Sequence, residues 1–343
     1  MKYALGNMLN GAGGLNADQL SLDLQFATDK TLTARKGPTP VFTRASTATF
    51  VGSNGLIQSA AINAARFDHD PVTLVCKGLL IEEGRTNLVF PSDTLTTQTR
   101  TVTAVAHTLS FYGAGTVVLS GAATATVTGT GAYPTRTTLT FTPTAGSLIM
   151  TVTGSVTQAQ LEAGAFPTSY IPTTTSSLAR SADVCSITGS DFSGFYNPLE
   201  GSLFTNTIFD APPLIGSAQR IWELSSATVV NSSRAFRSTV SGGIGFRSTS
   251  SSVTDVSFDT TVIPPSQQIK QSFGFIANNF AFYSNNAEIG IDTLCSIPAS
   301  LNALYIGSIS PTSGGGGQLN GTFASFRYFK KRLPNAKLQT LST

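Results

Sequence analysis

A regular alternation of apolar and polar residues constrains the fold of this chain more than any other feature. Residues 20–26 (LSLDLQF) place leucine or phenylalanine at every second position, and the same period returns at 108–111 and 137–141. A period of two puts the apolar side chains on one face of a β-strand. Threonine fills many outward positions, where its branched Cβ suits a pleated surface. We therefore expect strands with one buried face.

Turn residues separate these runs at short intervals. Examples are residues 53–55 (SNG), 113–115 (GAG), 129–131 (GTG) and Pro143. Such spacing leaves little room for long helices and is typical of sandwiches and jelly rolls. The sequence therefore predicts an all-β protein built from jelly-roll and β-sandwich domains.

Composition narrows the classes of function. Only 11% of the 343 residues are charged and 41% are apolar, which favours a folded β protein over a disordered one. The net charge is +3, and residues 330–332 (KKR) are the one basic cluster, which we interpret as a solvated strand end. We therefore expect no nucleic-acid partner. No apolar run approaches membrane-spanning length, so membrane insertion is not expected either.

The cysteines and histidines give no sign of a metal site. Cys76, Cys185 and Cys295 are widely separated, which argues against both a disulfide framework and a Cys-x-x-Cys site. His69 and His107 are the only histidines and form no His-x-His or His-Glu-x-x-His pattern. No Asp-x-Asp loop predicts calcium. We expect no cofactor and no metal ion.

Three stretches near the N-terminus resemble a segment that recurs in bacteriophage tail and virion proteins. They are residues 44–50 (RASTATF), 66–71 (RFDHDP) and 78–83 (GLLIEE), the last followed by 85–88 (RTNL). The resemblance implies a component of a tailed-phage virion that is made in the cytoplasm of the host bacterium. It also implies that other virion proteins are partners. The N-terminus has no continuous apolar core of a signal peptide, in keeping with this expectation.

Two further resemblances divide the rest of the chain. Residues 159–164 (AQLEAG) and 168–173 (TSYIPT) resemble the end of a small jelly roll similar to carbohydrate-binding modules. Residues 201–204 (GSLF) and 319–323 (LNGTF) resemble parts of a concanavalin A-like or laminin-G-like sandwich. We therefore expect a flexible arm at 1–19, the phage-type segment with a jelly roll at 20–175, and the sandwich at 178–343.

A short helix is expected near the C-terminus. Pro334 is placed to open it, and Leu338 and Leu341 share one of its faces.

Several charged residues are of the types used in catalysis, but their spacing does not support a catalytic role. Asp68 and Asp70 point away from His69 on a strand, so we interpret this trio as a turn. Glu82 and Glu83 are adjacent and face opposite sides of an extended chain, so they cannot flank one glycosidic bond. One of them is free to pair with an arginine two residues further on. We interpret Arg44, Arg66 and Arg85 as structural arginines that buttress loops.

Enzymatic activity is not expected. The chain has no Gly-x-Ser-x-Gly elbow and no phosphate-binding glycine pattern, and two histidines leave few ways to build a catalytic triad. A polysaccharide depolymerase is an alternative, because a glycosidase needs only two carboxylates brought together by the fold. The unranked candidates are Asp191, Glu200, Asp210, Glu223 and Asp255.

Sugar binding requires an exposed ring and neighbouring polar groups. Trp222, the one tryptophan, is a candidate platform with Arg220 beside it, although its alternating strand also favours a place in the core. The other candidate carbohydrate-binding residues are Tyr196, Tyr283 and Asn285.

The function expected from these resemblances is attachment. The protein is expected to be a tail fibre or other adhesion component that binds host-surface polysaccharide, plausibly as a homotrimer, since several weak sugar contacts then act together. A purely architectural protein, such as a head decoration, collar or tail ornament, is the alternative, because a fold alone does not decide function.

Overall fold

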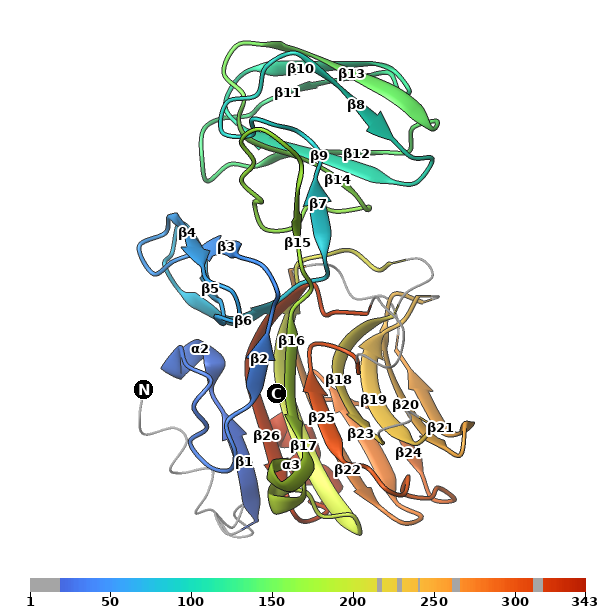
Figure 1. The fold of residues 1–343 in the computed structure, drawn as a ribbon. Coiled ribbons are helices and arrows are strands. Elements are labelled where there is room, and N and C mark those ends of the chain that lie inside the picture. The colour runs from blue at the N-terminus through green and yellow to red at the C-terminus, as the bar shows by residue number, and fades with distance from the viewer. Residues whose placement is uncertain (1–18, 215–217, 227–229, 240, 261–265, 311–316) are drawn as a thin grey trace. The chain divides into compact units, whose positions relative to one another are not determined.

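The computed structural model describes residues 19–214, 218–226, 230–239, 241–260, 266–310 and 317–343. Antiparallel strands dominate these residues, as Figure 1 shows, so the predicted all-β class is confirmed. Contacts divide the chain into two units. Unit 1 comprises Met1–Phe42, Lys77–Leu79 and Val184–Thr343, and unit 2 comprises Thr43–Cys76 and Leu80–Asp183.

Unit 1 is a sandwich of two antiparallel sheets. The first runs in the order β24-β23-β22-β17-β26, and both β1 and residues Lys77–Leu79 lie against β26. The alternating segment at residue 20 forms β1, as predicted. The strands of this sheet are β1 (Leu20–Leu24), β17 (Glu200–Phe209), β22 (Gln268–Ile276), β23 (Phe280–Ser284), β24 (Ala287–Asp292) and β26 (Gly321–Phe329), with β6 (Cys76–Ile81) contributing its central residues.

The second sheet of unit 1 runs in the order β2-β16-β25-β18-β19-β20-β21. Its strands are β2 (Val41–Thr43), β16 (Val184–Thr188), β18 (Gln219–Ser225), β19 (Ser232–Arg237), β20 (Ile244–Ser250), β21 (Val253–Asp259) and β25 (Ala303–Ile306).

Aromatic rings join the two sheets. Phe246 in β20 lies 4.2 Å from Phe273 in β22, centroid to centroid, and Trp222 in β18 lies 5.8 Å from the same ring. All three side chains are buried. Large rings bury much apolar surface per residue, so this cluster is a main source of unit 1 stability.

Helices are few and short in the described part of the chain. They are α2 (Phe26–Asp29), α3 (Gly189–Phe195) and α4 (Asn335–Leu341). Pro334 is the residue that precedes α4, and Leu338 is buried against Phe329 and Leu333, with Leu341 packed on the same cluster. The predicted C-terminal helix and its apolar face are therefore confirmed.

The close approach of β6 to β26 requires glycine at position 78. Gly78 in β6 has a φ of 119°, in the region that favours glycine, and a Cβ there would collide with the carbonyl oxygen of Phe323 in β26. Only a residue without a side chain lets β6 approach β26 this closely.

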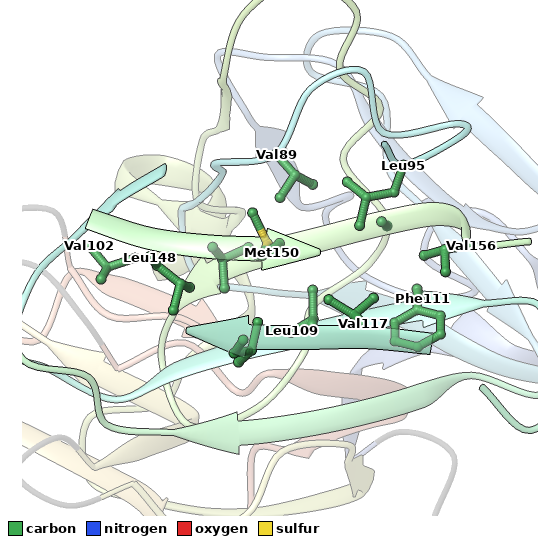
Figure 2. Packing of buried hydrophobic residues seen from close by; sticks show 12 residues of the cluster. Val89, Leu95, Val102, Leu109, Phe111, Val117, Leu148, Met150 and Val156 are labelled. Atoms are coloured by element: carbon green, nitrogen blue, oxygen red, sulfur yellow. The ribbon is translucent and has the colours of Figure 1, made fainter. Parts of the chain in front are cut away.

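Unit 2 contains a jelly-roll-like pair of sheets, with orders β11-β10-β13-β8 and β12-β9-β14. Twelve buried side chains from this region form one core, seen in Figure 2, with Leu109 and Phe111 of β9 facing Leu148 and Met150 of β13. The strands are β8 (Gln98–Val102), β9 (His107–Tyr112), β10 (Thr116–Gly121), β11 (Ala125–Thr128), β12 (Thr137–Phe141), β13 (Gly146–Thr153) and β14 (Thr157–Ala163).

The remaining strands of unit 2 are short. β3 and β4 form a hairpin, and β7 pairs with β15. Their bounds are β3 (Ala48–Val51), β4 (Ile57–Ala60), β5 (Phe67–His69), β7 (Arg85–Asn87) and β15 (Leu178–Arg180).

The division into units differs from the expected domain boundaries. Residues 20–42 belong with the C-terminal sandwich because β1 pairs with β26, and the chain after 175 stays in unit 2 as far as Asp183. Thr173, near the end of unit 2, is buried and hydrogen-bonded to Val89 and Ser92. The predicted arm lies, apart from residue 19, outside the described residues. Within those residues no helix has the length and hydropathy needed to cross a membrane.

Candidate functional site

Buried ion pairs bring Arg44, Arg66 and Glu82 together inside unit 2. Arg66 donates from Nη1 to Glu82 Oε2 at 2.7 Å and from Nη2 to Asp183 Oδ2 at 2.5 Å. Arg44 Nη1 reaches Asp183 Oδ1 at 3.2 Å, and the Ser169 hydroxyl donates to Glu82 at 2.6 Å. The four charged side chains are buried, and with Ser169 they come from five separate stretches of sequence. Arg180 Nη1 also lies 3.4 Å from Glu82 Oε2. We call Arg44, Arg66, Arg180, Glu82 and Asp183 the Arg66 network.

The arginines of this network hold Glu82 in the ionised state. Burial alone would raise the pKa of Glu82, but Arg180, Arg66 and the hydrogen bonds from Ser169 outweigh it and lower that pKa to about 2. Arg44 and Arg66 also donate to the carbonyl oxygens of Ala61 and Thr49. Their interpretation as structural arginines is confirmed.

The two adjacent glutamates face different partners, as their spacing predicts. Glu82 points into the Arg66 network, whereas Glu83 Oε1 lies 2.5 Å from Arg85 Nη2. The predicted pair between residues 83 and 85 is therefore confirmed.

The Asp68–Asp70 trio forms the end of a strand and a turn. Asp70 Oδ1 accepts hydrogen bonds from the backbone of Val72 and Thr73, and Asp68 accepts one from Val51. His69 is buried. The turn interpretation is confirmed for Asp70, whereas Asp68 and His69 lie in β5. Among the described residues no three His, Cys, Asp or Glu side chains gather as a metal site would require.

The five carboxylates proposed for a depolymerase each have separate surroundings. Glu200 binds Lys331 at 2.6 Å, Glu223 pairs with Arg220 at 3.1 Å, and Asp255 accepts from Ser296. Asp210 lies 3.9 Å from Lys77, and Asp191 is in the first turn of α3. None of these contacts joins two of the candidate acids.

Trp222 cannot serve as a stacking platform, because none of its surface is exposed. Its ring packs 6.0 Å from that of Phe246 and belongs to the core of the sandwich, the alternative that its alternating strand favoured. Arg220 pairs with Glu223 and lies 5.5 Å from the centre of the Phe236 ring. Both residues are therefore occupied by structural contacts.

Tyr283 and Asn285 lie on the same hairpin but differ in exposure. Tyr283 is buried and donates its hydroxyl hydrogen to Glu288 at 2.8 Å, so it also has no free ring face. Asn285 is an exposed turn residue with a φ of 46°, and its Oδ1 accepts from Lys270 N at 2.9 Å. It lines a polar recess of about 270 Å³ together with Gln268, Lys270, Asn286, Ser342 and Thr343.

Tyr196 lines a larger and more apolar cleft of unit 1, which we call the Tyr196 cleft. Its volume is about 420 Å³. One wall comes from α3 and the residues after it, and the other from the segment that leads to β25. The lining residues are Phe192, Ser193, Tyr196, Pro198, Ile297, Pro298, Ala299, Ser300 and Leu301.

The Tyr196 ring is held by other rings. It stacks on Phe192 at 4.7 Å and lies 5.8 Å from Tyr328, so its faces are not available to a sugar. Its hydroxyl makes no hydrogen bond with any residue that the structure describes. Burial raises the pKa of this phenol, which keeps it protonated and able to donate.

Backbone hydrogen bonds fix the two walls of the cleft. Asn302 accepts from Gly189 N at the start of α3 and donates to Ser225 O in β18. At the other end of the segment, Cys295 O accepts from Asn278 N, and Ser296 is held by Asp255 at 2.7 Å. The cleft is therefore formed before any ligand arrives.

Sequence patterns identified only one residue of this cleft. Residues 297–301 (IPASL) and the pair Tyr196 and Pro198 are far apart in the chain, and no local pattern signals that they meet. The five predicted sugar-binding residues lie in three different places: the Tyr196 cleft, the Asn285 hairpin and β18.

No protein-family model matches the sequence, and no curated protein matches it.

Several solved structures are similar to parts of the chain. The CBM40 domain of the Ruminococcus gnavus IT-sialidase, bound to α2,3 sialyllactose, matches 43% of this chain and 83% of its own, with 8% identity and a TM-score of 0.36. The NanB sialidase of Streptococcus pneumoniae matches 46% of this chain at 16% identity and a TM-score of 0.38, over 26% of its own length. A heptameric SAP-like pentraxin from Limulus polyphemus matches 42% of this chain and 70% of its own, at 11% identity and a TM-score of 0.31.

Proposed function

We propose that this chain is a virion protein of a tailed bacteriophage that binds host-surface glycans through the Tyr196 cleft without cleaving them. The observation that supports this cleft is its combination of surfaces. Proline rings and aliphatic side chains line it together with the hydroxyl groups of Ser193, Tyr196 and Ser300.

A pyranose ring matches both kinds of surface. Its C–H face packs on apolar groups, and its hydroxyls need donors and acceptors at the edge of the same site. The unpartnered, protonated hydroxyl of Tyr196 supplies a donor, and the exposed residues Ser193 and Ser300 supply both donors and acceptors. The exposed Pro198 offers an apolar face in place of the candidate platform Trp222.

The virion role is supported by the resemblance of residues 44–88 to a segment that recurs in phage proteins. The Arg66 network gives that segment a structural task, because it fixes the fold of unit 2. Attachment would take place with several copies, as a homotrimer, so that weak single contacts add up.

A glycan array probed with the intact chain tests the binding role. We expect binding to lipopolysaccharide or capsule glycans of the host. Tyr196→Phe, which removes only the hydroxyl, should weaken it about three- to tenfold, a typical loss for one hydrogen bond. Tyr283→Phe is the matched control, since that tyrosine lies outside the cleft. Ala299→Trp should abolish binding by filling the cleft.

Three results would overturn the proposal. Equal glycan binding by the wild type and Ala299→Trp would show that the Tyr196 cleft is not the binding site. Absence of binding to any host glycan, together with the presence of the protein in purified virions, would favour the architectural role. Release of reducing ends from host polysaccharide would instead indicate a depolymerase.

A further inference from the structure

A second cleft, in unit 2, brings two arginines face to face. β7 and β15 pair in a register that sets Arg85 directly opposite Arg180. Like charges at directly opposite positions destabilise a sheet unless something compensates them. Both residues line a cleft of about 390 Å³, which we call the Arg85 cleft. Its other lining residues are Gly84, Thr86, Leu88, Ala163 and Ala179.

The carboxylates around these arginines leave part of each guanidinium without a hydrogen bond. Arg85 Nη2 lies 2.5 Å from Glu83, but its Nε is 4.0 Å from Glu162 and has no partner. Arg180 Nη2 donates to the Glu83 carbonyl, while its Nη1 stays 3.4 Å from Glu82 Oε2 without a hydrogen bond. Buried N–H groups without partners are uncommon in proteins, and a site for an unseen ligand is one reason for them.

The surroundings hold Arg85 at the edge of this cleft. Its guanidinium lies 4.8 Å from the centre of the Phe166 ring and against the backbone of Gly164. A Cβ at Gly164, whose φ is 141°, would collide with Arg85 Nη1. The Arg85 side chain keeps 8% of its surface exposed and that of Arg180 keeps 1%, so Arg85 is the residue that a ligand would contact.

We propose that the Arg85 cleft binds the carboxylate of an acidic saccharide. A guanidinium presents a planar fork of N–H donors that a point charge cannot reproduce; in Arg85, Nη2 is held by Glu83 and Nε has no partner. Leu88, Ala163 and Ala179 offer apolar surface to the C–H face of a sugar, and the Thr86 side chain offers a hydroxyl. The volume suits a ligand of monosaccharide to disaccharide size. This inference does not depend on the Tyr196 cleft.

Calorimetric titration of the intact chain with glucuronic acid tests the proposal, with glucose and inorganic phosphate as comparisons. Glucuronic acid should bind at least tenfold more tightly than either. Ala179→Trp, which fills the cleft and leaves both arginines in place, should abolish binding. Ala132→Trp, also at an exposed alanine of unit 2, should not change it. Arg85→Lys keeps the charge but loses the fork and should weaken binding at least fivefold.

Three outcomes would overturn the inference. The first is that glucuronic acid does not bind detectably, or binds no more tightly than glucose. The second is that phosphate binds as tightly as the acidic sugar. The third is that the Ala179→Trp variant binds glucuronic acid like the wild type. Arg100→Gln is the matched arginine control, because Arg100 stacks 3.6 Å over Phe90 and does not line the cleft. Circular dichroism of each variant separates a blocked cleft from an unfolded unit.

Discussion

Arg66 and Asp183 lie 117 residues apart in the sequence, yet their side chains are fully buried and meet at 2.5 Å. The ion pair joins residue 66, just before β5, to the residue that ends unit 2. A buried charge is stable only while its partner is present, because removal of the partner leaves an uncompensated ion in a medium of low polarity. The pair therefore holds the last residue of unit 2 against residue 66.

Loss of the carboxylate should be costly. We expect Asp183→Asn to lower the free energy of unfolding by about 3–5 kcal/mol, since Arg66 and Arg44 both lose an anionic partner. Urea denaturation followed by circular dichroism measures this. The control is Asp29→Asn, which breaks a partly exposed pair with Arg35 and should change stability by about 0–1 kcal/mol. Equal effects of the two substitutions would contradict the role given to the network.

Glu82 should make the protein sensitive to acid. Its pKa is about 2 in the folded state against an ordinary value of 4.5, so the stabilisation is complete above pH 4.5 and is lost as the pH falls towards 2. The difference corresponds to about 3 kcal/mol. Unfolding free energies measured between pH 6 and 2 should fall steeply for the wild type. The fall should be shallower for Glu82→Gln, which is less stable at pH 6 but has no charge to lose.

Glu162 should act in the opposite direction. Burial raises its pKa to about 7 against the lowering effect of Arg136, Arg85 and Arg180, so the folded protein holds a proton that the unfolded chain releases above pH 4.5. Stability from this residue is therefore highest below pH 4.5 and declines as the pH rises to 7. Denaturation at pH 5 and pH 8 should show a smaller difference for Glu162→Gln than for the wild type. An unchanged difference would refute the assignment.

The single tryptophan should report on the core of unit 1 alone. Because Trp222 is fully buried and its indole N–H has no hydrogen-bond partner, its fluorescence should be blue-shifted and poorly quenched by acrylamide. Addition of a glycan that binds the protein should leave the emission unchanged. A red-shifted emission, or strong quenching in the native state, would show that the ring is exposed.

Gly78 should not tolerate a side chain. We expect Gly78→Ala to destabilise the protein by about 1–3 kcal/mol, because the residue has a positive φ and faces the Phe323 carbonyl. Thermal unfolding compares it with Gly194→Ala. Gly194 lies in α3 with open space where a Cβ would be added, so alanine there should be neutral or slightly stabilising.

The fold class could be predicted from the sequence because strand periodicity is local. The alternation at residues 20–26 and the proline before the last helix identify β1 and α4 directly. The unit boundaries could not be predicted in this way. They depend on the pairing of β1 with β26, a contact between the two ends of the chain that leaves no local pattern.

The candidate sites show the same limit. The spacing of Glu82, Glu83 and Arg85 predicts their opposite faces and the Glu83–Arg85 pair, since both follow from an extended backbone. Trp222 satisfies a strand pattern whether it faces the core or a ligand, so its burial had to come from the structure. The unpaired nitrogens of Arg85 and Arg180 depend on a cross-strand register that the sequence does not state.

Because β1 pairs with β26, the first strand cannot pair until nearly the whole chain has been synthesised. Asp23 and Arg327, which meet across these strands, are 304 residues apart. At ordinary translation rates of about 5–20 residues per second, the first strand leaves the ribosome roughly 15–60 s before its partner exists. Every residue of unit 2 is translated within that interval. The nascent chain must therefore keep one unpaired strand edge from mispairing until the last segment emerges.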